Sequence, residues 1–381
     1  MQQEFPPLDP VLARGERLAR VRDRMRELGV DALLLSLGAD LPWLTGYEAM
    51  PLERITMLVL PADDEATLVV PLLEAPRVVQ DRRLFSLRSW KDSEDPIRII
   101  EDLVGSRRQL AVSDRCWAAH LLSIQQALPS GVFRPASEVT SALRAVKDAT
   151  EIAAVRAAGA AADRVAEALL RGEIALVGRS EASVSAEISR RLLAEGNAKV
   201  NFAIVGSGPN SASPHHEPGE RVIGPGEPVV CDFGGALHLG GDTVGYCSDI
   251  TRTVVTGEPP ADFRALYDVL EAAQSRAVTT ARIGTPCEAV DAAGRDPITE
   301  AGYGEAFIHR IGHGIGIEEH EDPYLVAGNR QLLEAGHAFS IEPGIYLAGR
   351  FGARIEDIVV ATDDGPLACN SADHSLHIVE A

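Results

Sequence analysis

Residues 339–360 read FSIEPGIYLAGRFGARIEDIVV, and the fold of this chain can be inferred outward from them. The stretch sets Glu342 in a Ser-Ile-Glu-Pro-Gly turn and Glu356 in an Arg-Ile-Glu-Asp run, with glycines between the two glutamates. Apolar residues flank both glutamates, which predicts two strands of a β-hairpin that deliver them to the same place. Two buried carboxylates repel each other, and an unpaired buried charge is costly. The stretch therefore predicts a bound cation.

The rest of the predicted cation site lies upstream. Residues 229–253 read VVCDFGGALHLGGDTVGYCSDITRT and carry Asp232 and Asp249, while residues 307–324 read FIHRIGHGIGIEEHEDPY and carry three histidines, of which the glycine-flanked His313 is the candidate ligand. Two aspartates and two glutamates carry four negative charges, which two divalent cations balance. Oxygen-rich ligation with one imidazole suits manganese, cobalt or zinc.

The order of the motifs DFG, SDITRT, GHGIG, SIEPG and RIED resembles the creatinase/aminopeptidase superfamily of dinuclear metallopeptidases. Within it the chain is similar to the Xaa-Pro peptidases, prolidase and aminopeptidase P. The resemblance implies an α/β creatinase-like domain over residues 1–145 and an α+β "pita-bread" catalytic domain over residues 146–381. The family's metal ligands fall on residues that are all present here, unlike in creatinase, which shares the fold and lacks the metal set. They are Asp232, Asp249, His313, Glu342 and Glu356.

The resemblance also implies roles around the two metal ions. Glu342 is expected to act as the general base that takes a proton from water and passes it to the leaving nitrogen. Arg354 is expected to orient the ligand carboxylates beside the substrate, and a salt bridge to Asp357 is the alternative. Three histidines are expected to bind the proline end or stabilise the intermediate, with the last two counted as catalytic: His215, His309 and His320. The alternative for each is a hydrogen-bonded structural histidine.

One departure from the family concerns the first ligand hairpin. Sixteen residues separate Asp232 from Asp249, where the family usually has ten, and the surplus lies within ALHLGGDTVG and contains Asp242. An even insertion in a hairpin preserves which face each strand presents, so Asp249 can still face Asp232. Asp242 is a rival ligand, but it follows Gly240 and Gly241 at the expected loop tip. Asp232 is therefore the preferred assignment.

Composition limits the classes of partner and compartment. At 381 residues the chain suggests two domains, and a formal net charge of -20 argues against nucleic acid and anionic membranes as partners. No apolar run approaches the roughly 20 residues of a membrane span, and the opening MQQEFPPLDP is not a signal peptide. The five cysteines are odd in number and lack a paired metal spacing, which fits a reducing cytoplasm.

Periodicity predicts strands alternating with helices before residue 145, and a helix-rich region after it. Within residues 143–170, Asp148 with Thr150 and Glu151 predicts a capped helix start, and the alanine-rich run that follows predicts the linker helix that opens the second domain. The other expected helices cover 10–28, 97–104, 118–128, 181–196, 260–283 and 287–301. The expected strands of the first domain cover 31–36, 55–60, 67–71 and 109–112. A helix, helix, hairpin order recurs twice in the second domain, with one pair of acidic ligands in each half.

These observations predict a metal-dependent hydrolase that cleaves the Xaa-Pro imide bond, most simply in dipeptides. Aminopeptidase P, which accepts longer peptides, is the nearest alternative; methionine aminopeptidase and a non-catalytic binding protein of the same fold are more distant ones. A dipeptide places its carboxylate one residue past the scissile bond, where an arginine would bind it best. Arg54, at the mouth of an apolar strand, is the first candidate for that role, and a surface pair with Glu53 or Glu48 is its alternative. The resemblance further implies a homodimer.

Overall fold

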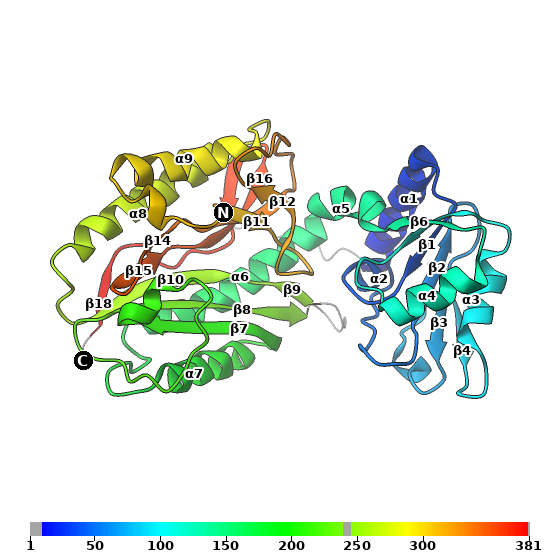
Figure 1. The fold of residues 1–381 in the computed structure, drawn as a ribbon, viewed down its shortest axis with the longest axis horizontal. Helices are drawn as coiled ribbons and strands as arrows, with labels where there is room; N and C mark the ends of the chain where they lie inside the picture. The colour runs from blue at the N-terminus through cyan, green and yellow to red at the C-terminus, as the bar shows by residue number, and fades with distance from the viewer. Residues whose placement is uncertain (1–9, 239–244, 380–381) are drawn as a thin grey trace. The chain divides into compact units, whose positions relative to one another are not determined.

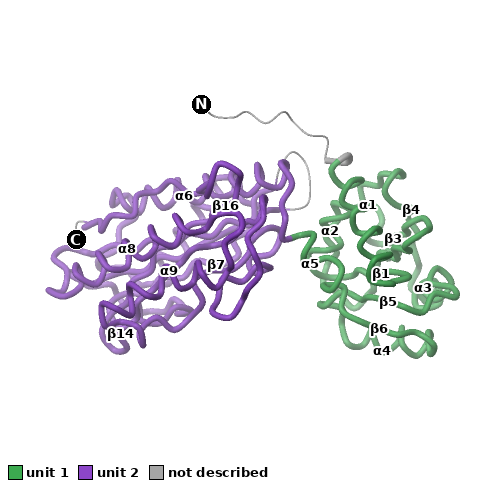
Figure 2. Tube along the Cα trace, turned by 90° about the horizontal axis from the view of Figure 1, so that it is seen from above, with its two compact units in different colours: residues 1–144, 240–244 green, residues 145–239, 245–381 purple. Residues whose placement is uncertain are grey.

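The computed structural model describes residues 10–238 and 245–379, which form two compact units. One unit comprises the described residues up to Arg144 and the other those from Ala145 onward (Figure 2). None of the described helices combines the length and the apolar character that a membrane span requires. The fold class predicted from the sequence, an α/β first domain followed by an α+β pita-bread domain, is confirmed by the architecture described below.

The first unit is built on a six-stranded mixed sheet with the order β4-β3-β2-β1-β5-β6. Its strands are β1 (Ala32–Leu35), β2 (Met57–Pro61), β3 (Thr67–Pro71), β4 (Ser86–Trp90), β5 (Gln109–Val112) and β6 (Val132–Pro135). Strand β1 pairs antiparallel with β2 and parallel with β5. All four residues of β1 are buried, because helices cover both faces of the central strands.

Helices lie on the two sides of this sheet (Figures 1 and 2). They are α1 (Pro10–Leu28), α2 (Asp40–Thr45), α3 (Pro96–Val104), α4 (Ala118–Ala127) and α5 (Ser137–Ala145). Figure 2 shows α1 and α4 on opposite sides of the strands. Ile100 and Val104 of α3 and Ile124 of α4 pack into one cluster with Leu34 and Val59 of the sheet. This burial of apolar side chains stabilises the unit.

The second unit opens with α6 (Ala149–Leu170), whose start has the capping box expected from the sequence. The Asp148 carboxylate accepts a hydrogen bond from the backbone N–H of Glu151, and the Glu151 carboxylate accepts one from the N–H of Asp148. The remaining helices of this unit are α7 (Glu181–Ala194), α8 (Phe263–Thr280) and α9 (Cys287–Glu300). In Figure 1, α8 and α9 lie above the strands and α7 below them.

Two five-stranded sheets carry the site of the second unit. The first has the order β18-β10-β8-β7, with β9 added to β8. Its strands are β7 (Asn197–Ser207), β8 (Pro228–His238), β9 (Gly245–Cys247), β10 (Ile250–Thr256) and β18 (His377–Val379). The second has the order β12-β11-β13-β16-β17. Its strands are β11 (Gly312–Gly314), β12 (Glu321–Leu325), β13 (Ala338–Ile341), β16 (Asp357–Thr362) and β17 (Gly365–Ala368).

The hairpin predicted over residues 339–360 is present, but each of its arms consists of two strands. Strand β13 pairs with β16, and β14 (Gly344–Leu347) pairs with β15 (Phe351–Arg354). Glu342 lies at the break between β13 and β14, and Glu356 at the break between β15 and β16. Pro343 accounts for the first break, because proline has no N–H to donate to a ladder. The breaks free both glutamates from regular pairing at equivalent points of the two arms.

Candidate metal centre and active site

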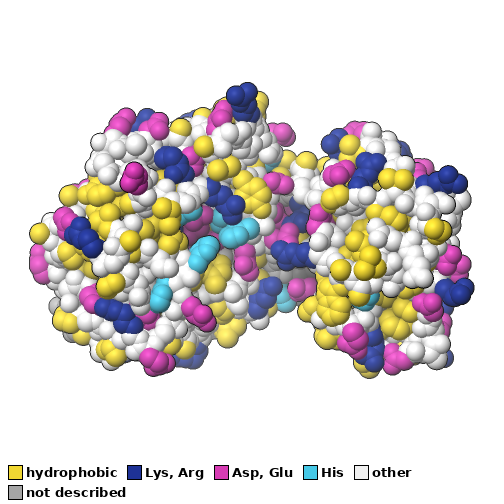
Figure 3. All heavy atoms as spheres, viewed as in Figure 1, with side chains coloured by type: hydrophobic (Ala, Val, Ile, Leu, Met, Phe, Trp, Pro, Cys, Tyr) yellow, Lys and Arg dark blue, Asp and Glu magenta, His cyan; other side chains and the backbone are white. Residues whose placement is uncertain are grey.

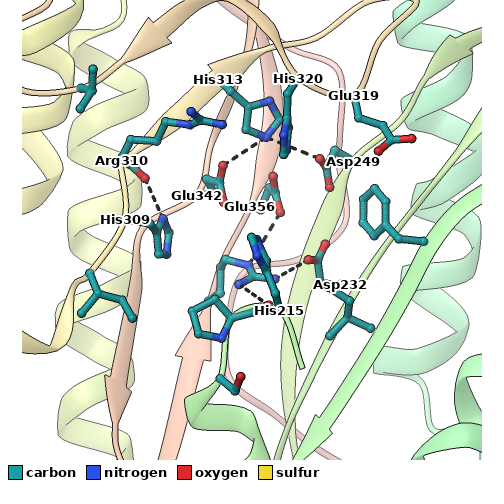
Figure 4. Close-up of a pocket in the computed structure, with 17 residues that line it drawn as sticks. His215, Asp232, Asp249, His309, Arg310, His313, Glu319, His320, Glu342 and Glu356 are labelled. Atoms are coloured by element: carbon teal, nitrogen blue, oxygen red, sulfur yellow. Dashed lines mark hydrogen bonds and ion pairs between the residues drawn. The ribbon is translucent and has the colours of Figure 1, made fainter. Parts of the chain in front are cut away.

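A cavity of about 740 Å³ lies in the second unit. Figure 3 shows histidine side chains grouped at a hollow on this unit, and Figure 4 shows the lining in detail. All of the ligands predicted from the sequence line this cavity: Asp232, Asp249, His313, Glu342 and Glu356. The predicted substrate-side residues of the second domain line it as well: His215, His309, His320 and Arg354. The structure thus brings together residues that are scattered over 142 positions from His215 to Glu356, both ends included.

Both sheets contribute acidic side chains to the cavity. Asp232 lies within β8, and Asp249 lies between β9 and β10. Asp232 is paired in register with Thr251, and Thr251 forms an isolated antiparallel bridge with Glu356 of the other sheet. This bridge connects the two halves of the unit where their acidic residues meet. The Thr251 hydroxyl donates a hydrogen bond to Glu356 Oε2 at 2.6 Å and so fixes that carboxylate.

Three side chains form a tight group suited to a metal ion. One potential ligand atom from each of Asp249, His313 and Glu356 lies within 4.8 Å of the others. The His313 Nε2 atom is also 3.2 Å from Glu342 Oε1 and 3.7 Å from Asp249 Oδ2. His313 Nδ1 lies 3.1 Å from the Gly314 carbonyl. Donation by Nδ1 to that carbonyl would leave Nε2 as the nitrogen that binds a metal ion. The carboxylates of Asp249, Glu342 and Glu356 repel one another, and a cation bound between their oxygens would be attracted to all three.

The carboxylates are destabilised as anions in this arrangement. Burial, followed by repulsion from Glu356 and Asp232, raises the pKa of Asp249 well above its usual value. Burial, followed by repulsion from Glu342 and Asp232, does the same to the pKa of Glu356. Burial also raises the pKa of Asp232, although Arg354 opposes that effect. Divalent cations would supply the positive charge that keeps all of these groups ionised.

Two buried oxygen atoms point to the same conclusion. Asp232 Oδ1 and Asp249 Oδ1 have no hydrogen-bond partner among residues 10–238 and 245–379. A buried carboxylate oxygen without a partner is rare, because the group loses its hydration without compensation. Metal coordination would satisfy both atoms. The residues present therefore fit divalent cations with oxygen-rich ligation and one imidazole.

Glu342 differs from the other acidic residues. Burial alone would raise its pKa, but the hydrogen bond and charge of His313, together with His309 and Arg354, lower the pKa to about 2. The Ser340 hydroxyl donates to Glu342 Oε1 at 3.0 Å, and the same hydroxyl accepts from the backbone N–H of His313. Glu342 is therefore held as a carboxylate in a fixed orientation.

Arg354 contacts two of the candidate ligands, Asp232 and Glu356. Its guanidinium donates to Asp232 Oδ2, and its Nε atom donates to the Thr251 hydroxyl at 2.9 Å. Its Nε atom is also 3.9 Å from Glu356 Oε2. The alternative partner Asp357 binds Arg252 instead, at 2.7 Å, on the buried side of the strand. Arg354 therefore contacts two of the candidate ligand carboxylates, as its expected role requires.

Sequence reasoning missed Tyr346, which joins Arg354 to a predicted substrate-side histidine. Arg354 Nη1 donates to the Tyr346 hydroxyl at 2.9 Å, and that hydroxyl lies 3.0 Å from His309 Nε2. His309 Nδ1 lies 2.7 Å from the Arg310 carbonyl, so the imidazole is held at both nitrogens. A signal was available, because Tyr346 follows Glu342 by four residues and alternates in direction with the apolar residues of β14.

The other predicted site residues have different surroundings. His320 packs against His313 with ring centroids 4.0 Å apart, and burial, followed by His313, lowers the pKa of His320 to about 4. Arg54 lies in the first unit, where it pairs with Asp92 at 2.9 Å and Glu53 at 2.6 Å. Its surface-pair alternative is therefore present in the structure. The rival ligand Asp242 lies outside the described residues.

Comparison with known proteins identifies both domains. Residues 153–363 match the model of metallopeptidase family M24, and residues 17–146 match that of the creatinase/prolidase N-terminal domain. The chain is 44% identical over 370 residues to the probable dipeptidase PepE of Mycobacterium tuberculosis, covering 96% of each chain. It is 34% identical to the Xaa-Pro dipeptidase of Lactobacillus helveticus, covering 95% of this chain and 98% of the relative. The crystal structure of recombinant prolidase from Thermococcus sibiricus superposes with a TM-score of 0.89 at 34% identity, covering 99% and 100% of the two chains.

Proposed function

Because the chain belongs to metallopeptidase family M24, we propose that it hydrolyses the Xaa-Pro imide bond of dipeptides with the aid of two divalent cations. Family membership makes the chain a peptide hydrolase that uses a divalent metal. The choice of dipeptides is supported by similarity to proteins named dipeptidase, Xaa-Pro dipeptidase and prolidase. The number of cations and their identity as manganese, cobalt or zinc belong to the proposal.

One observation carries the assignment of the ligands. Four carboxylates and one imidazole converge on the cavity, and two of the carboxylate oxygens are buried without a hydrogen-bond partner among the described residues. The proposal assigns metal binding to Asp232, Asp249, His313, Glu342 and Glu356. When bound, divalent cations supply an activated water nucleophile and stabilise negative charge that develops on the scissile carbonyl oxygen.

The chain's own residues supply proton transfer and orientation. Glu342 takes the proton of the attacking water and passes it to the proline nitrogen as the C–N bond breaks. Ser340 keeps the Glu342 carboxylate oriented during this transfer. The proline nitrogen is a tertiary amide without an N–H, so the substrate must be recognised by shape and by its flanking groups. His215, His309 and His320 are proposed to contact the proline end and the reacting carbonyl, and Arg354 to orient the ligands beside it.

Discrimination between dipeptides and longer peptides requires a cation for the dipeptide's carboxylate. We retain Arg54 as a candidate for this role, in competition with its pairs to Asp92 and Glu53. Solvent screens these exposed pairs, so they do not prevent Arg54 from binding a substrate carboxylate. Aminopeptidase P activity is the alternative if Ala-Pro-Ala is cleaved as well as Ala-Pro. The proposal also includes a cytoplasmic homodimer; all five cysteines are free thiols, which suits a reducing compartment.

Hydrolysis of Ala-Pro and Ala-Pro-Ala before and after chelation tests this function. Exhaustive chelation should abolish cleavage, manganese, cobalt or zinc should restore it, and the melting temperature should fall on chelation because bound metal stabilises the native state. The value of kcat/KM should be higher for Ala-Pro, and Arg54→Ala should reduce it selectively for that substrate. Full activity at a metal content near zero would contradict the metal assignment. Equal rates on both peptides in the wild-type chain would favour aminopeptidase P.

A further inference from the structure

Glu319 is an acidic residue of the cavity that the assigned chemistry leaves unused. It lines the same cavity as the metal-ligand cluster, but it is not a member of the group formed by Asp249, His313 and Glu356. In Figure 4 it lies beside Asp249, and its carboxylate extends away from the cluster. No hydrogen bond or ion pair joins the Glu319 side chain to any residue in 10–238 or 245–379. Its charge is therefore available to a substrate.

Apolar side chains accompany Glu319 in the lining. Phe202 and Ile204 of β7 both line the cavity and are only partly buried. Ile204 is paired in register with Asp232, and Phe202 with Gly234. Paired residues of antiparallel strands point to the same face, so Ile204 and, by alternation, Phe202 stand on the face that carries Asp232. The cavity lining thus offers an apolar surface, on the face of β7 and β8 that carries Asp232, together with the Glu319 carboxylate.

The opposite wall has the opposite charge. Arg310 also lines the cavity, and its guanidinium lies 4.4 Å from the centroid of the Tyr324 ring. Figure 4 places Arg310 and His309 on one side of the ligand carboxylates and Glu319 on the other. If His309 contacts the proline end, as the proposed function holds, the residue before the scissile bond lies toward Glu319. The Arg310 guanidinium lies over the Tyr324 ring, and Glu319 carries the negative charge on the side where the first residue of the substrate would lie.

We propose that Glu319, with Phe202 and Ile204, selects dipeptides whose first residue has a long cationic side chain, lysine or arginine. The inference rests on the proposed Xaa-Pro dipeptidase function and adds the class of first residue. Lysine and arginine have apolar stems that would pack against Phe202 and Ile204 while the charged end reaches Glu319. The aromatic face of Phe202 adds a favourable site for a cation. The α-ammonium group, by contrast, is attached beside the scissile carbonyl and so remains near the ligand cluster rather than Glu319.

The test compares substrates of similar length and different charge: Lys-Pro, Arg-Pro, Leu-Pro and Glu-Pro, with the manganese-loaded chain. Wild-type kcat/KM should be highest for Lys-Pro and Arg-Pro. Glu319→Gln should lower the Lys-Pro to Leu-Pro ratio by about tenfold, the value of one charge-assisted contact, and leave Leu-Pro nearly unchanged. Glu319→Lys should reverse the order and favour Glu-Pro. Glu217→Gln removes an equal charge from an exposed residue outside the cavity lining and should preserve the wild-type ratio.

The outcomes separate this inference from the proposed function. If the wild-type chain cleaves Leu-Pro and the Lys-Pro to Leu-Pro ratio is the same in Glu319→Gln, the role of Glu319 is refuted while the dipeptidase function stands. An equal loss on all four dipeptides would assign Glu319 to the shared α-ammonium group and would likewise refute side-chain selection. If the wild-type chain cleaves none of the four dipeptides, the proposed function fails and the inference fails with it.

Discussion

At the scale of the residue, the pKa of each carboxyl group in the site is set by its surroundings rather than by whether it is an aspartate or a glutamate. Asp249 and Glu356 are buried close to each other, and burial together with repulsion from neighbouring carboxylates raises both pKa values. Glu342 is more exposed than these two, and the hydrogen bond and charge of His313, with His309 and Arg354, lower its pKa. The same chemical group therefore has opposite pKa shifts at neighbouring positions of one cavity.

Asp232 is the residue whose replacement best tests the ligand assignment. Asp232→Ala should reduce the bound metal, because it removes one of four carboxylates and leaves Arg354 with only its longer ion pair to Glu356. Elemental analysis of the purified variant after dialysis measures this directly. Asp242→Ala is the matched control, since both changes remove one aspartate from the same segment of the chain, and it should retain the wild-type metal content. The reverse pattern would transfer the assignment to Asp242.

At the scale of the element, the loop that bears His215 is anchored at several points. Glu181, the first residue of α7, is fully buried and accepts hydrogen bonds from the N–H and hydroxyl of Ser207 and from the Asn210 amide. His216 Nε2 lies 2.8 Å from the other oxygen of the Glu181 carboxylate. His216 is thus held by Glu181, while its neighbour His215 lines the cavity. On the other side, the Ser211 hydroxyl accepts a hydrogen bond from the Gly352 N–H of β15.

Glu181→Ala should therefore affect both stability and catalysis. It leaves several buried donors without an acceptor, which should cost roughly 3 kcal/mol in the free energy of unfolding. Release of His216 should also lower kcat/KM for Leu-Pro through the displaced His215. Urea unfolding and dipeptide kinetics measure the two effects. Glu181→Gln keeps the shape and part of the hydrogen bonding, so it should lie between wild type and Glu181→Ala; an unchanged unfolding free energy in Glu181→Ala would refute this account.

Helices and strands whose apolar residues recur with a clear periodicity could be predicted from the sequence. Elements that form mainly because of tertiary contacts could not. The helix over 10–28 and the capping box at Asp148 were predicted because local sequence determines them. Strand β4 (Ser86–Trp90) was missed, since it alternates serine and arginine with apolar residues and only Trp90 is fully buried. The five candidate ligands were found from motifs, but Tyr346, Arg310 and Glu319 were not. The position of Tyr346 within β14 was its only signal in the sequence. The contribution of Arg310 and Glu319 depends on which side chains the fold brings together, and no spacing in the sequence reveals that.

At the scale of the whole molecule, buried histidine makes stability depend on pH. His337 is 1% exposed, accepts a hydrogen bond from the Glu334 N–H at Nδ1, and has its pKa lowered to about 4 from 6.5 by burial and then by Lys147. Lys147 itself pairs with Glu321 at 2.6 Å. Because the pKa of His337 is lower in the folded state, the unfolded state binds the extra proton first as the pH falls. The stability contribution is complete above about pH 6.5 and is lost on acidification toward pH 4.

Replacement of His337 should isolate this contribution. In His337→Gln the acid-induced fall in melting temperature between pH 6.5 and 4 should be smaller than in the wild-type chain, because the substituted residue does not titrate. The quantity to compare is the difference between the two melting temperatures across the pH series. The difference in melting temperature at pH 7–8 serves as the reference, because His337 is neutral there and the difference reflects only the lost packing and hydrogen bond. A difference that stays constant down to pH 4 would contradict the assignment.

The division of the acidic residues between two sheets has a consequence for biosynthesis. Asp232 and Asp249 belong to the first sheet, and Glu342 and Glu356 border strands of the second. Ribosomes add about 5–20 residues per second, so the roughly 120 residues between Asp232 and Glu356 take about 6–25 s to make. During that interval the nascent chain has half of its acidic groups and no Thr251–Glu356 bridge to hold them. If these residues bind metal as proposed, the complete set of ligands exists only after the second sheet has been synthesised, so selection among the ions that the cell supplies is a property of the folded domain.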